Sequence, residues 1–187
     1  MRIISGKFKS RRISAPKKLP VRPTTGLSKE SLFNVINNLY DFDEISVLDL
    51  FSGTGSISYE FCSRGTQKIT CVDANSYCVN FIRKMFAEFE EQAVIIKSDV
   101  FKFLELCSQH FTVIFADPPY DMSQEDFTAI ANLVFEKQLL EEEGVLVIEH
   151  SIHTSFEEHP NFDYQKKYGG TIFSFLKVTA TGVNEEE

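Results

Sequence analysis

Apolar runs alternate with helix-like segments along the chain from residue 45 to residue 150. Each run is almost continuous in its apolar residues, as is typical of strands that are buried on both faces of a parallel sheet. The segments between the runs repeat apolar residues at helical spacing, most clearly between residues 78 and 89. The alternation therefore predicts an α/β fold with helices on both faces of a mostly parallel sheet. The predicted strands are ISVLDL, QKITCVD, QAVIIKSD, TVIFAD and GVLVIEH.

Two further segments complete the predicted sheet near the carboxyl end of the chain. FDYQKKY and TIFSFLKV flank Gly169 and Gly170, a spacing that favours an antiparallel β-hairpin. Before the first strand, apolar residues at helical spacing between residues 32 and 39 predict a helix, with Ser28 as its N-cap. With 187 residues, the chain has the length of one domain, or of one domain with an appendage.

A carboxylate stands at the end of each of the first four predicted strands. Asp49, Asp73, Asp99 and Asp117 occupy these positions. In open parallel α/β sheets, ligands bind beyond the carboxyl ends of the strands. We therefore expect these four side chains to line one site.

The segment FSGTG follows the first predicted strand and is expected to form a ligand-binding turn. Gly53 and Gly55 allow a sharp turn and a close approach of a ligand to the backbone. A dinucleotide fingerprint needs a third glycine, but Ser58 occupies that position, and Asp49 disfavours a pyrophosphate. A carboxylate suits a cationic ligand instead, and S-adenosylmethionine carries a sulfonium and an ammonium group.

The expected binding site for this methyl donor has further parts. Asp73 lies about 20 residues beyond the glycine turn, where an acid accepts hydrogen bonds from both ribose hydroxyls. Asp99 and Val100 are placed for the adenine amino group. The residues expected to bind the donor are Asp49, Phe51, Ser52, Gly53, Thr54, Gly55, Asp73, Ala74, Asp99 and Val100.

The segment DPPY, which follows the fourth predicted strand, is expected to carry the chemistry. An exocyclic amine on a base is a poor nucleophile, because its lone pair is delocalised into the ring. The Asp117 carboxylate and the Pro118 carbonyl are two acceptors that would aim this lone pair, and Pro119 restricts the backbone. The carboxylate also offsets the positive charge that develops on nitrogen. Tyr120 offers a face on which an extruded base can stack, and no metal is required.

The first 25 residues form a basic arm on an acidic chain. The arm carries eight cations and no acidic residue, so the net charge of −8 leaves −16 on the rest. Apolar residues alternate with these charges, which predicts a β-hairpin with Gly6 and Lys7 near its turn. A localised basic surface indicates contact with a polyanion, and we expect Lys7, Lys9, Arg11 and Arg12 to bind it.

Other features exclude several classes of protein. No apolar run reaches the ~18–20 residues of a membrane helix, and the amino-terminal segment lacks the apolar stretch of a signal peptide. The four cysteines have no metal-ligand spacing, so we expect buried, reduced thiols and no metal ion. These features indicate a cytoplasmic protein without a membrane contact, which we expect to be a monomer.

The same motifs carry a family resemblance over essentially the whole chain. The segments RIISGKFKSRRI, RPTTGLSKESLFNVI, LDLFSGTG with Glu60, DPPY and YGGTIFSFLK resemble, in this order, the RsmD family of class I S-adenosylmethionine-dependent methyltransferases. DPPY is shared with other amine methylases, whereas the RPTT segment is more specific. The resemblance implies a Rossmann-like, seven-stranded sheet with an N-terminal β-hairpin extension. It also implies methylation of a guanine N2 amine in 16S rRNA, within an assembled or nearly assembled 30S subunit.

The resemblance further implies how the chain is divided. The basic hairpin and a cover over the active site would span residues 1–25, and Arg22 and Thr24 would belong to this cover. The methyltransferase domain would span residues 26–182, followed by an acidic tail of residues 183–187.

Three positions depart from the family pattern. Gly26 stands where the family usually has an acid, Lys29 stands where it often has an arginine, and Ser58 replaces a common glycine. None of these positions belongs to the expected chemistry, so the departures bear on the target nucleotide more than on the reaction.

Four other functions share parts of these motifs. An adenine-N6 methylase of DNA or RNA would use DPPY, but it normally needs a separate target-recognition domain. A glutamine-N5 protein methylase usually has an asparagine in place of Asp117. A non-catalytic RNA-binding assembly factor would have no need for DPPY. A nicotinamide oxidoreductase would need the missing third glycine.

Overall fold

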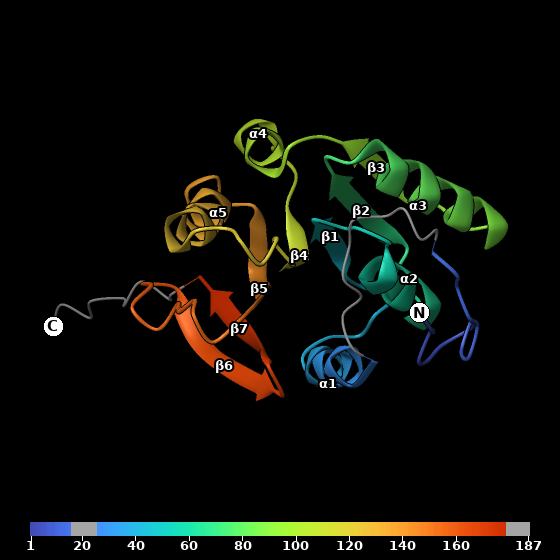
Figure 1. The fold of residues 1–187 in the computed structure, drawn as a ribbon, viewed down its shortest axis with the longest axis horizontal. Helices are drawn as coiled ribbons and strands as arrows, with labels where there is room; N and C mark the ends of the chain where they lie inside the picture. Colours follow the sequence, from blue (N-terminus) through green and yellow to red (C-terminus); the bar gives the residue numbers. More distant parts are fainter. Residues whose placement is uncertain (16–25, 179–187) are drawn as a thin grey trace, which may run out of the picture.

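A computed structural model describes residues 1–15 and 26–178 of the chain, and Figure 1 shows its fold. The described strands are β1 (Ser46–Leu50), β2 (Lys68–Asp73), β3 (Val94–Lys97), β4 (Phe111–Ala116), β5 (Leu140–His150), β6 (Phe162–Tyr168) and β7 (Thr171–Lys177). The described helices are α1 (Gly26–Asn37), α2 (Ser56–Arg64), α3 (Ser76–Glu88), α4 (Val100–Leu106) and α5 (Gln124–Glu136). Strands and helices alternate from β1 to β5, as the sequence pattern predicts.

The described strands form one seven-stranded sheet in the order β3-β2-β1-β4-β5-β7-β6. The pairs from β3 to β5 are parallel, and β7 runs antiparallel to both of its neighbours. The prediction of a mostly parallel α/β sheet that ends in an antiparallel hairpin is therefore confirmed. The strand order reverses between β1 and β4, which places a crevice beyond their carboxyl ends.

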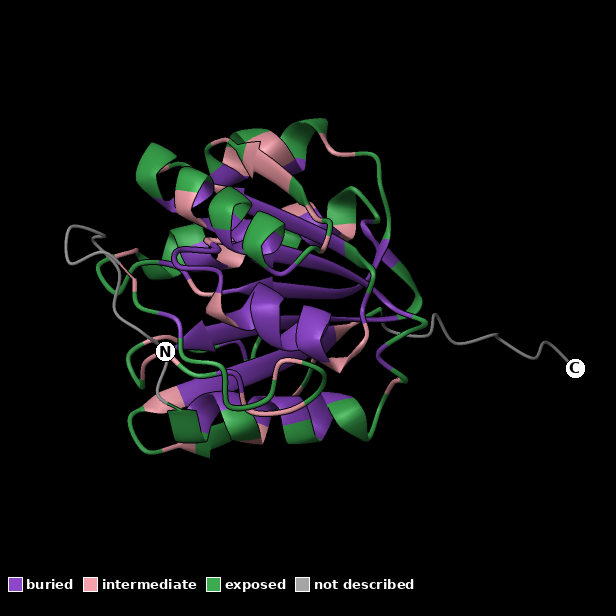
Figure 2. Ribbon diagram, turned by 90° about the vertical axis from the view of Figure 1, so that its right-hand side faces the viewer, coloured by how far each residue is buried: buried purple, intermediate pink, exposed green. Residues whose placement is uncertain are grey.

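Helices cover both faces of this sheet, and Figure 2 shows the buried strands between them. On one face, Leu32 of α1, Tyr59 of α2 and Ile82 of α3 belong to one buried apolar cluster. On the other face, Leu104 of α4 and Ile130 of α5 belong to a second cluster. Because successive side chains of a strand point to opposite faces, the side chain at the end of each strand lies on the face of one of these two clusters.

The first helix differs in two details from the sequence prediction. Ser28 lies inside the described helix α1, Gly26–Asn37, and is buried, so it does not serve as the N-cap. α1 ends at Asn37, so Leu39 lies beyond the helix and is partly exposed. Residue spacing indicates that a helix exists but does not fix its first and last turns, which depend on tertiary packing.

The described part of the basic arm folds back on itself through a single antiparallel bridge between Arg2 and Arg12. The predicted hairpin is therefore present with one bridge in place of two regular strands. The arm turns at Gly6, where φ is 81° and an added Cβ would lie 1.8 Å from the carbonyl oxygen of Ser63. The arm bonds instead to α2, because the backbone N–H of Lys7 donates to the same carbonyl over 2.7 Å.

Within the described ranges, no helix combines the length and apolar character that crossing a membrane requires. The cysteines are free thiols, and three of them, Cys62, Cys71 and Cys78, are buried while Cys107 is partly exposed. Residues 1–15 and 26–178 contain no cluster of three or more His, Cys, Asp or Glu side chains that could hold a metal ion.

Candidate active site

A cavity of about 460 Å³ opens beyond the carboxyl ends of β1, β2 and β4. Its volume lies in the usual range of ligand pockets, ~300–1,000 Å³. We call it the donor cavity, because all the residues expected to bind the methyl donor line it except Gly55. The four residues of DPPY line it as well. Arg22 and Thr24, assigned to the cover, lie outside the described residues.

Asp49 lies at the buried end of β1, with 1% of its surface exposed. The Ser58 hydroxyl on α2 donates a hydrogen bond to its carboxylate. Burial raises the pKa of Asp49 to about 7, and the charges of Asp117 and Asp73 contribute, while the Ser58 hydrogen bond opposes the increase. A ligand cation would favour the ionised form of this carboxyl group, because an opposite charge lowers the pKa of an acid.

Asp73 ends β2 and faces the glycine turn. Its two carboxylate oxygens accept hydrogen bonds from the backbone N–H groups of Gly53, over 2.8 Å, and Asn75, over 2.7 Å. These bonds fix the orientation of the carboxylate, and each oxygen retains acceptor capacity for a further donor. The arrangement suits a ligand with two neighbouring hydroxyl groups.

Gly55 is not among the residues that line the donor cavity, and its assignment to donor binding stays a prediction. It precedes α2 with a φ of 78°, in the left-handed region that favours glycine. A Cβ added at this position would lie 2.6 Å from the ring of Tyr59. Gly55 is therefore required by the turn and by the close packing of Tyr59 against it.

The start of α4 forms another part of the cavity wall. The Asp99 side chain caps this helix, because it accepts a hydrogen bond from the N–H of Lys102 over 3.1 Å. Val100, the first residue of the helix, is buried and lines the cavity beside it. The cap fixes the direction of the Asp99 carboxylate, which also lines the cavity.

DPPY follows β4 directly and combines a partly buried carboxyl group with an exposed ring. Burial raises the pKa of Asp117 well above its usual range, and the charge of Glu149 raises it further. The N–H of Met122 donates to the carbonyl of Pro119 over 3.0 Å, which closes a turn. Tyr120 lies in this turn and is 58% exposed. A ligand can therefore reach the ring from solvent, while Asp117 is partly buried beside it.

A second, much smaller recess lies against the same segment. Asp117, Pro118 and Tyr120 line both the donor cavity and this recess. Glu149, near the end of β5, is 4% exposed and lines only the recess. The remaining lining residues are Phe127, His150, Ser151 and Thr154. Residues of DPPY thus line both the donor cavity and the recess.

The sequence analysis missed several residues that line the donor cavity and the recess. In the donor cavity they are Ser56, Ile57, Asn75, Cys78 and Phe115. No local pattern marks most of them, because only the packing of α2 and α3 against the glycine turn brings them to the cavity. Glu149 could have been found, because it lies near the carboxyl end of a predicted strand, as the four aspartates do.

Two of the four basic side chains expected to bind a polyanion have partners within the chain. Lys7 forms an ion pair with Glu91. The guanidinium of Arg11 lies over the ring of Phe89, 4.4 Å from its centroid. The other two, Lys9 and Arg12, are exposed. The exposed surface of the arm therefore keeps a positive charge.

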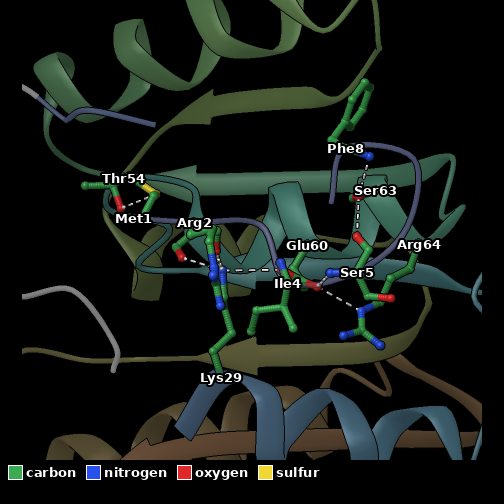
Figure 3. Close-up of polar contacts among 11 residues, drawn as sticks. Met1, Arg2, Ile4, Ser5, Phe8, Lys29, Thr54, Glu60, Ser63 and Arg64 are labelled. Carbon is green, nitrogen blue, oxygen red and sulfur yellow. Dashed lines mark hydrogen bonds and ion pairs between the residues drawn. The ribbon is translucent and has the colours of Figure 1, made fainter. Parts of the chain in front are cut away.

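Glu60 on α2 holds the basic arm in place, and Figure 3 shows its contacts. Its fully buried carboxylate accepts hydrogen bonds from the backbone N–H groups of Ile4, over 2.9 Å, and Ser5, over 3.0 Å. The same carboxylate forms ion pairs with Lys29, at 3.4 Å, and with Arg64, at 3.0 Å. One buried acid thus joins the arm, α1 and α2.

Lys29 connects this anchor to the donor cavity. Its ammonium group donates to the carbonyl of Arg2 over 2.9 Å and to the hydroxyl of Ser56, which lines the cavity, over 3.2 Å. Burial lowers the pKa of Lys29, and the charge of Glu60 acts in the opposite direction. Lys29 therefore supports the arm and the cavity wall. This position, where the family often has an arginine, does not belong to DPPY.

Comparisons with known proteins agree with this geometry. A family model described as "Conserved hypothetical protein 95" matches residues 1–177. "Putative rRNA methyltransferase YlbH" from Bacillus subtilis (strain 168) is 33% identical over 163 residues, covering 84% of this chain and 86% of that protein. "Ribosomal RNA small subunit methyltransferase D" from Escherichia coli (strain K12) is 25% identical over 191 residues, covering 100% of this chain and 94% of that protein.

Solved structures share the fold. The structure titled "Putative methyltransferase yhhF from Escherichia coli" has a TM-score of 0.82 at 23% identity, over 94% of this chain and 96% of that one. A 16S rRNA N2 G1207 methyltransferase of T. thermophilus (RsmC), solved with AdoMet and guanosine, has a TM-score of 0.65 at 18% identity, over 82% of this chain and 43% of that one. The family match covers nearly the whole chain, which therefore belongs to the conserved hypothetical protein 95 family, the RsmD family of methyltransferases.

Proposed function

We propose that the protein transfers a methyl group from S-adenosylmethionine to the N2 amine of one guanine in 16S rRNA of the small ribosomal subunit. The observation that carries the proposal is the position of DPPY, which forms a wall of the donor cavity while Tyr120 is exposed. The name of the Escherichia coli relative and the ligands of the T. thermophilus neighbour support it. A donor in the cavity and a base on the other side of DPPY would meet at Asp117.

The donor cavity fits S-adenosylmethionine, which supplies an electrophilic methyl group on a sulfonium. Asp73 suits the ribose hydroxyls, because two backbone N–H groups already orient its carboxylate. Val100 adds apolar surface beside Asp99 for the adenine ring. Asp49, buried at the end of β1, is placed to balance the cationic end of the donor.

On the acceptor side, Asp117 and the carbonyl of Pro118 would accept the two N–H bonds of the amine and aim its lone pair at the methyl group. The bond between nitrogen and the methyl carbon forms while the bond between that carbon and sulfur breaks, so the positive charge passes to nitrogen. Asp117 is suited to take the proton that nitrogen then loses, because its pKa is raised. Stacking on the ring of Tyr120 would hold the base and contribute ~1–3 kcal/mol to its binding free energy.

The basic arm would bring RNA to this site. The Thr54 hydroxyl of the donor cavity lies 3.7 Å from the sulfur of Met1, so the arm reaches the rim of the cavity. A phosphate bound by the exposed Arg12, which is bridged to Arg2 next to Met1, would then lie near the reacting base. This local attraction would oppose the long-range repulsion between RNA and the acidic remainder of the chain.

The experiment that tests the proposal offers labelled S-adenosylmethionine with different substrates. Purified 30S subunits, free 16S rRNA, DNA and a protein release factor are incubated separately, and labelled nucleosides or amino acids are identified after digestion. Label in N2-methylguanosine from 30S subunits or 16S rRNA is expected. Label in N6-methyladenine, in N5-methylglutamine or in no substrate would contradict the proposal.

A further inference from the structure

Glu149 is a fifth carboxyl group near the sheet edge that carries the four aspartates. β4 and β5 are parallel with Ala116 beside Ile148, so Asp117 and Glu149 follow as the next neighbours on the two strands. Phe115 belongs to the cluster beneath α1, α2 and α3, and the period of two places Asp117 on that same face. Glu149 follows Ile148 of the opposite cluster, so it shares this face with Asp117.

The two carboxyl groups interact. Both line the recess, and the charge of Glu149 contributes to the raised pKa of Asp117. The recess also includes Pro118 and Tyr120, the residues assigned to the carbonyl acceptor and the stacking face. A base stacked on Tyr120, with its amine between Asp117 and the Pro118 carbonyl, can place one of the two ring atoms beside the amine, N1, next to Glu149.

Guanine and adenine differ in that neighbouring atom. In guanine, N1 carries a hydrogen and is a donor beside the N2 amine. In adenine, N1 is an acceptor beside the N6 amine. An ionised carboxylate can only accept hydrogen bonds, so a second carboxylate next to Asp117 matches the edge of guanine and opposes that of adenine.

We propose that Glu149 selects guanine by accepting a hydrogen bond from N1–H, while Asp117 and the Pro118 carbonyl hold the N2 amine. This inference rests on the proposed methylation of guanine N2 and adds the residue that rejects adenine. His150, the next residue on β5, is held elsewhere, because its ring nitrogens bond the Ser151 carbonyl over 2.8 Å and the Ser174 hydroxyl over 2.7 Å.

2-Aminopurine separates this role from a structural one. It keeps the amine at position 2 but has an N1 that accepts hydrogen bonds instead of donating one. Once the methylated guanine has been mapped, 30S subunits are reconstituted with either base at that position. The wild-type protein should methylate 2-aminopurine with a kcat/KM about 10- to 100-fold lower, because the Glu149 carboxylate then faces a second acceptor at N1 where guanine offers a donor.

Glu149→Gln should reduce the ratio of kcat/KM for guanine to kcat/KM for 2-aminopurine by about tenfold or more. The new amide can donate a hydrogen bond to N1 of 2-aminopurine, but it no longer offers a carboxylate acceptor to guanine. Glu142→Gln is the matched control, since Glu142 is exposed on the same strand and should leave the preference unchanged. Equal wild-type rates on the two bases would overturn the inference. So would a Glu149→Gln variant that slows both bases by the same factor, as expected of a residue that acts only through the fold.

The wild-type comparison needs no variant, so it decides the inference even if Glu149→Gln fails to fold. A failure of the proposed function gives a different result, because the wild-type protein would then label no guanine N2 in unmodified subunits.

Discussion

The backbone N–H of Gly53 donates a hydrogen bond to the carboxylate of Asp73 over 2.8 Å, and this bond joins the turn after β1 to the end of β2. It orients the carboxylate that we assign to the ribose, and it requires the turn to hold Gly53 at a φ of 53°. The geometry of the turn and that of the ribose site therefore depend on each other.

Gly53→Val should abolish binding of S-adenosylmethionine. A β-branched residue is strongly disfavoured at positive φ, and its side chain would enter the cavity that Gly53 lines. Calorimetric titration with S-adenosylhomocysteine checks this. The matched control is Gly170→Val in the exposed turn between β6 and β7, where an added Cβ meets no described atom within 4 Å. Unchanged affinity of the Gly53→Val variant would contradict the assigned role of the turn.

Asp117→Ala should leave donor affinity nearly unchanged and lower the single-turnover rate on 30S subunits by about 10²–10³, the usual effect of losing one aimed transition-state partner. Asp121→Ala is the control, because Asp121 lies just after DPPY and is exposed. The role assigned to Asp117 is wrong if its variant reacts as fast as this control.

Donor binding should depend on pH through Asp49. Its pKa of about 7 exceeds that of an ordinary aspartate, so the donor-free protein gains stability from this group at low pH and loses it as the pH rises through 7. A cationic donor prefers the ionised form, so its affinity should fall about fivefold between pH 7 and pH 6, with proton release on binding. Calorimetry in buffers of different ionisation enthalpy measures both quantities.

Ser58→Ala provides the second half of this test. The Ser58 hydroxyl stabilises the Asp49 carboxylate, so its removal should move the midpoint of the pH profile upward. Ser14→Ala, at an exposed position of the arm, should leave the profile in place. An affinity that does not vary between pH 6 and pH 8 would show that Asp49 does not respond to the donor charge.

Replacement of Lys9 and Arg12 by alanine should weaken binding to 30S subunits and leave donor affinity unchanged. If each contacts one phosphate, the slope of log affinity against log salt should become shallower by about 1.4–1.8 units, at roughly 0.7–0.9 per contact. Adding Lys7→Ala and Arg11→Ala should extend the change toward 3–4 units only if these residues leave Glu91 and Phe89 for phosphates.

The control for the arm is the pair Lys68→Ala and Lys137→Ala, two exposed lysines at the start of β2 and the end of α5. They remove the same charge from exposed positions outside the arm. If the arm variant and this control have the wild-type salt slope, the arm does not bind phosphate.

The sequence predicts most of this fold because the signals are local. The run TVIFAD indicates both a buried strand and the aspartate at its end, and the structure places that carboxyl group in the donor cavity. One reason for glycine at position 55 is not visible in the local pattern, because it comes from the ring of Tyr59, four residues later, which packs against the turn. The family resemblance includes Glu60, but its role as the anchor of the arm left no signal, since its partners Ile4 and Ser5 contribute only backbone N–H groups.

The Glu60 anchor also imposes an order on folding during synthesis. The bond between Ile4 and Glu60 spans 56 residues, so the arm is made before its partner helix exists. At translation rates of ~5–20 residues per second, the arm waits several seconds for α2. During that interval its cations are not held by the native contacts with Glu91 and Phe89. The nascent arm is therefore a transient polybasic segment beside the ribosome, and it becomes ordered only when Glu60 is buried.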